Sequence, residues 1–205
     1  MRALVAAVIG GVAIGLLGRA SVQSTEVVAW ISRLGAPWLL TAFLVGAYVG
    51  DRRRGALSGG GALAIGTAVY YFVFHFVERD IGLAYAVIVG AAWAAVGIAI
   101  GGAFGYAGAA WRARPGDRWA RVVAIAALGG ALIGEGLLLM MRWDDPTAHA
   151  ILLAEMAIGA LLPLAATRWR DWPAALALGM TFAVSAVVLE AYTRAALRVV
   201  GWGGV

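Results

Sequence analysis

The chain has 205 residues, of which 63% are hydrophobic and only 13% are charged, and its mean hydropathy is +0.88. Soluble domains are about half apolar and about a quarter charged, so this composition excludes a soluble globular domain and indicates an integral membrane protein. The net charge is +5 and every basic residue is an arginine near the end of an apolar run, a pattern that orients membrane helices and does not indicate a nucleic-acid partner. Cysteine is absent and only two histidines occur, so thiol chemistry, disulfides and three-histidine metal sites are excluded.

Apolar runs follow one another along the whole chain, separated by short polar breaks. A helix needs about 20 apolar residues to cross a bilayer, and breaks this short make neighbouring helices antiparallel. Because no run alternates at period two, a membrane-spanning β-barrel is disfavoured. We therefore expect an all-α polytopic bundle of about seven spanning helices, forming one domain over residues 1–205. The expected helices cover Ala3–Gly18, Ala36–Gly50, Gly55–Val77, Ile81–Trp111, Val122–Met141, Ala148–Thr167 and Trp172–Leu197.

The first, second and fourth runs each allow more than one interpretation. The first ends at Gly18-Arg19-Ala20, a pattern that also suits a cleaved signal peptide and would leave six helices. The second is short unless Val27–Leu34 extends it; alternatively, Ser24-Thr25-Glu26 caps a separate interfacial helix that carries Trp30. The fourth run has 31 residues without a charge, so its helix must tilt, extend beyond the membrane or break at a glycine.

The arginines predict the orientation. If the Asp51–Arg54 loop is cytoplasmic, alternation of the runs places ten of the sixteen arginines inside and six outside. The sequence therefore predicts a multi-pass protein of a bacterial plasma membrane with a cytoplasmic N-terminus.

Glycines recur at a spacing of four, which lets helix backbones approach closely in lipid. The strongest example is Gly97, Gly101 and Gly105 on the fourth run. This stripe predicts either a tight contact within the chain or the seam of a homodimer. The expected partners are the lipid bilayer and, as an alternative function, another membrane protein or a second copy that packs against the glycine faces.

Three glutamates interrupt the apolar runs, and a charge in the membrane costs roughly 2.5–3.5 kcal/mol. With a rise of about 1.5 Å per residue, Glu135, Glu155 and Glu190 all fall in the outer half of the membrane. Small residues precede Glu135 and Glu190 at helical spacing, so we expect these acids to face the bundle. The sequence predicts an acidic, outward-facing pocket between the runs at 55–77, 122–141, 148–167 and 172–197.

The same acids also have a purely structural interpretation. Glu190 and Arg194 are four residues apart and can pair on one helix face, and Glu155 can reach the head groups. Glu135 has no cation near it in the sequence, but it can pair with Arg142 or Arg194 across helices. Three carboxylates in one dry pocket cannot all stay ionised unless cations join them, so a ligand site here favours a cationic solute or proton coupling.

Aromatic residues and histidines complete the predicted ligand site. We assign Tyr71, His75 and Trp93 to the pocket, and most of the nine tryptophans to the membrane interfaces. No catalytic motif, metal site, cofactor site or phosphate-binding loop occurs, so no catalytic residue is assigned; an intramembrane enzyme that uses Glu135 and His75 is the least favoured alternative.

Three segments carry a resemblance: Gly35-Ala36-Pro37-Trp38-Leu39-Leu40, Arg52-Arg53-Arg54 and Leu132-Ile133-Gly134-Glu135-Gly136-Leu137. In these the chain resembles an uncharacterised family of actinobacterial multi-span membrane proteins, a domain of unknown function. The resemblance implies size, topology and source but no activity. The first hypothesis is therefore a small-solute binding or transport protein, and the alternative is a structural or regulatory membrane subunit.

Overall fold

In the computed structural model, which describes residues 1–20, 26–112, 117–199 and 201, helices joined by short turns form the whole described part of the chain, with no strand among them. The long helices are α1 (Arg2–Ala20), α4 (Arg52–Phe72), α5 (Leu83–Trp111), α6 (Arg118–Met140), α7 (Pro146–Ala166) and α8 (Trp172–Val199). The shorter ones are α2 (Glu26–Ser32), α3 (Ala36–Val49), a π-helical turn η2 (Val73–Val77) and a 3-10 turn η3 (Trp169–Asp171).

All seven predicted runs form helices, and six described helices are long and apolar enough to cross a membrane. These helices expose many large apolar side chains, as contact with lipid requires. The chain is therefore a multi-pass membrane protein with an all-α fold. The second run, Ala36–Gly50, forms α3, which has only 14 residues and extends about 21 Å, less than the roughly 30 Å hydrocarbon core.

The structure also decides between the alternatives that the sequence left open. Val27–Leu34 does not extend the second run, because α2 is a separate short helix that carries Trp30. The cap expected at Ser24 and Thr25 lies outside the described residues. The fourth run forms one unbroken helix, α5, of 29 residues. No glycine breaks this helix. Its glycines lie at or near contacts with neighbouring helices, and the helical backbone hydrogen bonds continue through them.

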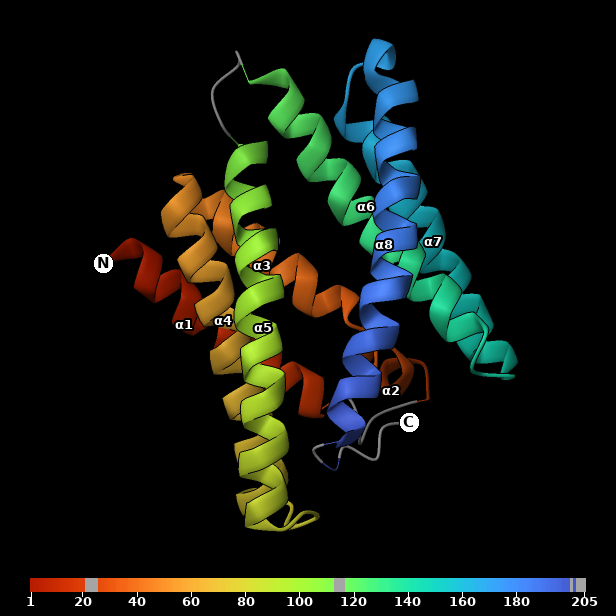
Figure 1. Ribbon diagram of the computed structural model, residues 1–205. Helices are drawn as coiled ribbons and strands as arrows, with labels where there is room; N and C mark the ends of the chain where they lie inside the picture. The colour runs from red at the N-terminus through yellow and green to blue at the C-terminus, as the bar shows by residue number, and fades with distance from the viewer. Residues whose placement is uncertain (21–25, 113–116, 200, 202–205) are drawn as a thin grey trace.

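The helices form two groups that stand side by side (Figure 1). In the first group α1 and α3 cross obliquely behind the α4–α5 hairpin, and in the second α7 and α8 pack on either side of α6. Phe43 of α3 packs against Ile125 and Leu128 of α6, which joins the groups through a buried apolar cluster. The α5 and α8 helices contact each other much less than either contacts its own group.

Close contacts between glycines hold the first group together. A Cβ atom added to Gly101 would lie 2.7 Å from the carbonyl oxygen of Gly59 on α4, and one added to Gly55 would lie 2.8 Å from that of Gly105. Gly105 also contacts Gly46 of α3. The backbones of α3, α4 and α5 therefore touch at one point, which we call the glycine junction. The predicted glycine stripe of α5 is thus used in a contact within the chain.

Ion pairs gather at the two ends of the bundle. One end holds the pairs Arg52–Asp117 and Arg118–Asp171, which connect α4, α6 and η3. The opposite end holds the pair Arg194–Glu190 of α8 and the cluster of Arg19 with Glu78 and Asp80. The loops that the alternation of runs places on the same side do lie at the same end of the bundle.

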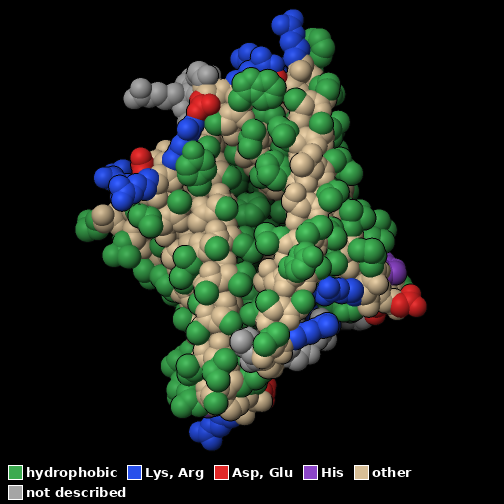
Figure 2. All heavy atoms as spheres, in the orientation of Figure 1, with side chains coloured by type: hydrophobic (Ala, Val, Ile, Leu, Met, Phe, Trp, Pro, Cys, Tyr) green, Lys and Arg blue, Asp and Glu red, His purple; other side chains and the backbone are tan. Residues whose placement is uncertain are grey.

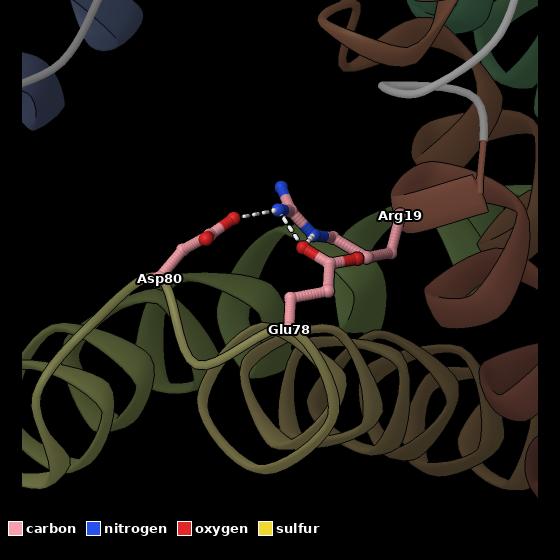
Figure 3. Close-up of polar contacts among 3 residues, drawn as sticks. All are labelled: Arg19, Glu78 and Asp80. Atoms are coloured by element: carbon pink, nitrogen blue, oxygen red, sulfur yellow. Dashed lines mark hydrogen bonds and ion pairs between the residues drawn. The ribbon is translucent and has the colours of Figure 1, made fainter.

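Arg19 anchors the end of α1 (Figure 3). Its side chain is buried, its Nε donates to Glu78 at 2.6 Å, and its guanidinium lies 3.8 Å from the ring centre of Phe74. Asp80, in the turn before α5, contacts the same guanidinium at 3.2 Å. α1 thus supplies this cation and packs its own glycines against α4.

We predict that Gly101→Ala destabilises the protein by about 1–3 kcal/mol, because the added methyl group meets backbone that cannot move. Gly102→Ala is the matched control: it lies one residue further on the same helix, and its Cβ would be 3.6 Å from the nearest heavy atom, an ordinary contact. Thermal unfolding in detergent, followed by circular dichroism, measures the difference. Equal stability of the two variants would contradict the glycine junction.

We also predict that Arg19→Leu destabilises the protein by about 3–5 kcal/mol, because it leaves the carboxylate of Glu78, which is only 12% exposed, without its cation. Arg79→Leu serves as the control, since Arg79 is exposed and lies next to Glu78 in the chain. The same unfolding assay applies, and a loss of stability in the Arg79 variant equal to that of the Arg19 variant would count against the Arg19 anchor.

Candidate functional site

A cavity of about 590 Å³ lies between the two groups of helices. It is walled by α4 and α5 on one side and by α6 and α8 on the other, and the start of α3 closes part of it. Figure 2 shows that face of the molecule hollowed between α5 and α8, with hydrophobic side chains at the bottom of the hollow. Because α5 and α8 are spanning helices, the hollow opens sideways at the depth of the membrane.

The larger part of the cavity is apolar. Its walls are formed by aliphatic and aromatic side chains of α3, α5 and α8, and no ionisable group lines this part. The main contributors are Leu39, Val96, Ile100, Phe104, Phe182 and Leu189.

One end of the cavity is polar. It is the end nearest the α4–α5 turn and the α6–α7 turn, where Tyr70, Tyr71, Glu135, Glu190 and Arg194 line the wall and Arg33 lies at the rim. The site is thus amphipathic, with an apolar body and a polar head.

Glu135 occupies a defined place at this polar end. It is buried on α6, and one of its carboxylate oxygens accepts a hydrogen bond from the backbone N–H of Gly35, the residue that precedes α3. The first N–H groups of a helix have no partner within the helix and carry a partial positive charge, so a carboxylate here satisfies both needs. A Cβ atom on Gly35 would lie 3.2 Å from Glu135 Oε1, and glycine therefore permits the close approach.

Glu190 is compensated in a different way. Its Oε1 accepts from Arg194 Nε at 2.7 Å, one helical turn along α8, and both side chains line the cavity. Arg33, from the turn before α3, lies with its guanidinium 4.7 Å from the ring centre of Trp30. The polar end therefore carries two carboxylates and two guanidiniums.

Glu155 lies behind the cavity and does not line it. It is buried on α7, where its carboxylate interacts with that of Glu135 on the neighbouring helix. Both oxygens of Glu155 are inaccessible and have no hydrogen-bond partner in the described part of the chain. The three glutamates therefore gather in one region, but only Glu135 and Glu190 face the cavity.

Of the other residues predicted for the ligand site, two line the cavity and one does not. Tyr71 and Trp93 line the cavity. His75 does not: it lies in the η2 turn, its Nδ1 is 2.7 Å from the carbonyl oxygen of Ile81, and its ring packs against Phe76. Glu135 and His75, the pair considered for an intramembrane enzyme, are not brought together at the cavity.

The structure differs from the predicted pocket in two respects. The predicted walls included the 148–167 run, but α7 contributes no lining residue, because α6 lies between it and the cavity; α3 and α5 line it instead. The predicted pocket was acidic, whereas the cavity is mostly apolar and its two acids are each matched by a donor.

Sequence reasoning missed Trp38, Arg33 and Phe104, which all line the cavity. Trp38 was assigned to the membrane interface because it lies at the start of an apolar run. That run is too short to span, so its start need not lie at the interface. The length of the run was the signal that could have identified Trp38 as an interior residue.

Comparison with known proteins identifies the family. The model of a family of unknown function (DUF6518) matches residues 1–197, and the chain belongs to this family. No curated protein and no solved structure matches it.

We predict that Glu135→Leu destabilises the protein by about 1–3 kcal/mol, because the partly buried N–H of Gly35 is then left without its acceptor. Glu135→Gln keeps an acceptor oxygen and should cost clearly less. Thermal unfolding of the two variants beside the wild type makes the comparison. If both variants matched the wild type, the carboxylate would not be needed at the start of α3.

Proposed function

We propose that this protein binds a small amphiphilic solute, one with an apolar body and a polar head, in the cavity between α5 and α8. The observation that carries the proposal is the division of one cavity into a long apolar part and a compact polar end. Its volume of about 590 Å³ is within the range of small-molecule sites, which are mostly apolar with a few placed polar groups. Binding of this kind is common to solute-binding proteins and transporters.

The polar groups narrow the class of solute. Arg33 and Arg194 balance Glu135 and Glu190 at the cavity, so these four side chains give no excess of negative charge. A zwitterionic or uncharged polar head fits this balance better than the purely cationic solute that the three glutamates suggested. Tyr70 and Tyr71 add hydroxyl groups that can donate to such a head.

The position of the hollow suggests the route of entry. It opens between two spanning helices, where the surroundings are acyl chains. An apolar solute already dissolved in the bilayer can enter there sideways without passing through water. In the orientation proposed from the arginines, with a cytoplasmic N-terminus in a bacterial plasma membrane, the polar end lies in the outer half of the membrane.

The alternative of a structural or regulatory subunit has less support. It rested on glycine faces that could accept a partner. The glycines of α1, α5 and α6 contact α4 and α8 of the same chain, so these faces are occupied.

We predict that Ala127→Phe weakens binding at least tenfold, because Ala127 of α6 lines the cavity and a phenyl ring would occupy space that the solute needs. Val123→Phe is the matched control, since Val123 lies one turn earlier on α6 and its side chain is exposed on the outside. Native mass spectrometry of each protein, released from lipid nanodiscs, would detect the co-purifying small molecule.

The expected result is a bound molecule on the wild type and on Val123→Phe, reduced at least tenfold on Ala127→Phe. A tenfold loss corresponds to about 1.4 kcal/mol of binding free energy. If the wild type carried no small molecule after growth and extraction, or if both variants carried it equally, the proposed function would be wrong.

A further inference from the structure

Glu155 is the one ionisable side chain in the middle of the described helices whose need for a partner is not met by the groups around it. It is 6% exposed, and both of its carboxylate oxygens are inaccessible and without a hydrogen-bond partner among the described residues. An uncompensated carboxylate buried in this way would cost several kcal/mol or more. Some further species must therefore accompany it.

Its surroundings are dry and tightly packed. Leu152 and Met156 of α7 press against Gly136 of α6, where a Cβ atom would lie 3.2 Å from the carbonyl oxygen of Leu152. Leu139 and Leu34 complete an apolar cluster with Leu152 on the side of the α6–α7 turn. This packing explains why Glu155 is not reached from the cavity.

The charged groups that face Glu155 are few. From α6 it meets the carboxylate of Glu135, and from α8 it interacts with that of Glu190. Arg194 is engaged with Glu190, and the backbone N–H of Gly35 donates to Glu135. On its own helix, His149 lies toward the α6–α7 turn, with Nε2 at 2.6 Å from the carbonyl oxygen of Trp143. Each of these three donors, Arg194, the N–H of Gly35 and His149 Nε2, therefore lies against another acceptor.

We propose that Glu155 and Glu135 form a buried proton-binding site in which the two carboxyl groups share one proton. Two adjacent carboxylates in a dry place repel each other unless a proton or a cation lies between them. A metal ion requires more ligands than this pair offers, and no group of three or more acidic or histidine side chains suited to a metal occurs among the residues that the structure describes. A proton needs only the two oxygens that face each other.

The geometry assigns the proton to one member of the pair. Glu135 accepts a hydrogen bond at the start of α3, an environment that favours its ionised form. Glu155 has no such donor, so Glu155 carries the proton and its O–H donates to Glu135. The pair then connects α7 to α6, and Glu135 connects α6 in turn to the start of α3.

This site also bears on the cavity, a step that rests on the proposed function. Glu135 is shared: one oxygen lies at the polar end of the cavity, and the same carboxylate receives the proton of Glu155. A solute that donates to Glu135 competes with Glu155 for its oxygens. By linkage, binding of such a solute and release of the proton must then promote each other.

Infrared spectroscopy of the purified protein, with carbon-13 in the glutamate carboxyl groups, tests the proton directly. At pH 7 an exposed glutamic acid is ionised, so a protonated-acid C=O band that moves on labelling must come from a buried glutamate. We expect this band in wild-type protein from which co-purified small molecules have been removed, its loss in Glu155→Gln, and its retention in the control Glu190→Gln. The spectrum of the wild type needs no variant, so misfolding of a variant leaves the test intact.

Absence of the band in the wild type at pH 7 would overturn the shared proton, as would an unchanged band in folded Glu155→Gln. The result is distinguishable from failure of the proposed function, because the band is recorded without a solute. If the band is present but co-purified solute does not weaken or shift it, the linkage to the cavity is wrong while the proton site remains.

Discussion

The structure depends on one constraint: α3 begins against α6, at a point where it is partly buried. The first N–H groups of a helix have no partner within the helix and need another acceptor. Here Glu135 of α6 reaches across to the N–H of Gly35 and meets that need. The contact joins the two groups of helices at the level where the cavity has its polar end, so the same carboxylate supports the fold and shapes the site.

The cavity exists because the small faces of α5 and α8 point away from each other. The glycines of α5 pack against α4, while Gly179 and Ala183 of α8 pack against the glycines of α6. Each group is therefore closely packed within itself. What α5 and α8 turn toward each other are large side chains such as Trp93, Phe104 and Phe182, which cannot interdigitate over a flat contact and leave a lined space.

Much of this architecture was predictable, and the reason is the bilayer. The lengths of the apolar runs predicted the helices, because a membrane-spanning helix must be apolar. The alternation of runs and the arginines at their ends predicted which loops lie at the same end of the bundle. Glycine spacing predicted the α5 contact, since close approach in lipid requires small residues. The intracellular orientation of the N-terminus and the actinobacterial source stay predictions.

The composition of the cavity wall was not predictable in the same way. In a soluble helix the apolar face identifies the interior, but these helices are apolar all round, so periodicity does not say which side faces a neighbour. The sequence therefore gave no reason to place α5 rather than α7 at the cavity. Glu155 illustrates the difficulty, because its charge within an apolar run placed it in the predicted pocket, yet α6 stands between it and the cavity.

The three glutamates show why a charge within a membrane span is a weak guide to ligand chemistry on its own. They share a region, but one satisfies a helix start, one pairs with Arg194, and one faces another acid without a donor. The protein's own groups therefore offset the cost of burying two of the three carboxylates, those of Glu135 and Glu190. The presence of these two acids requires no solute. The feature that supports the proposed solute is the apolar space beside them, because an apolar cavity of this size offers room for an apolar body next to a polar end that can hold a polar head.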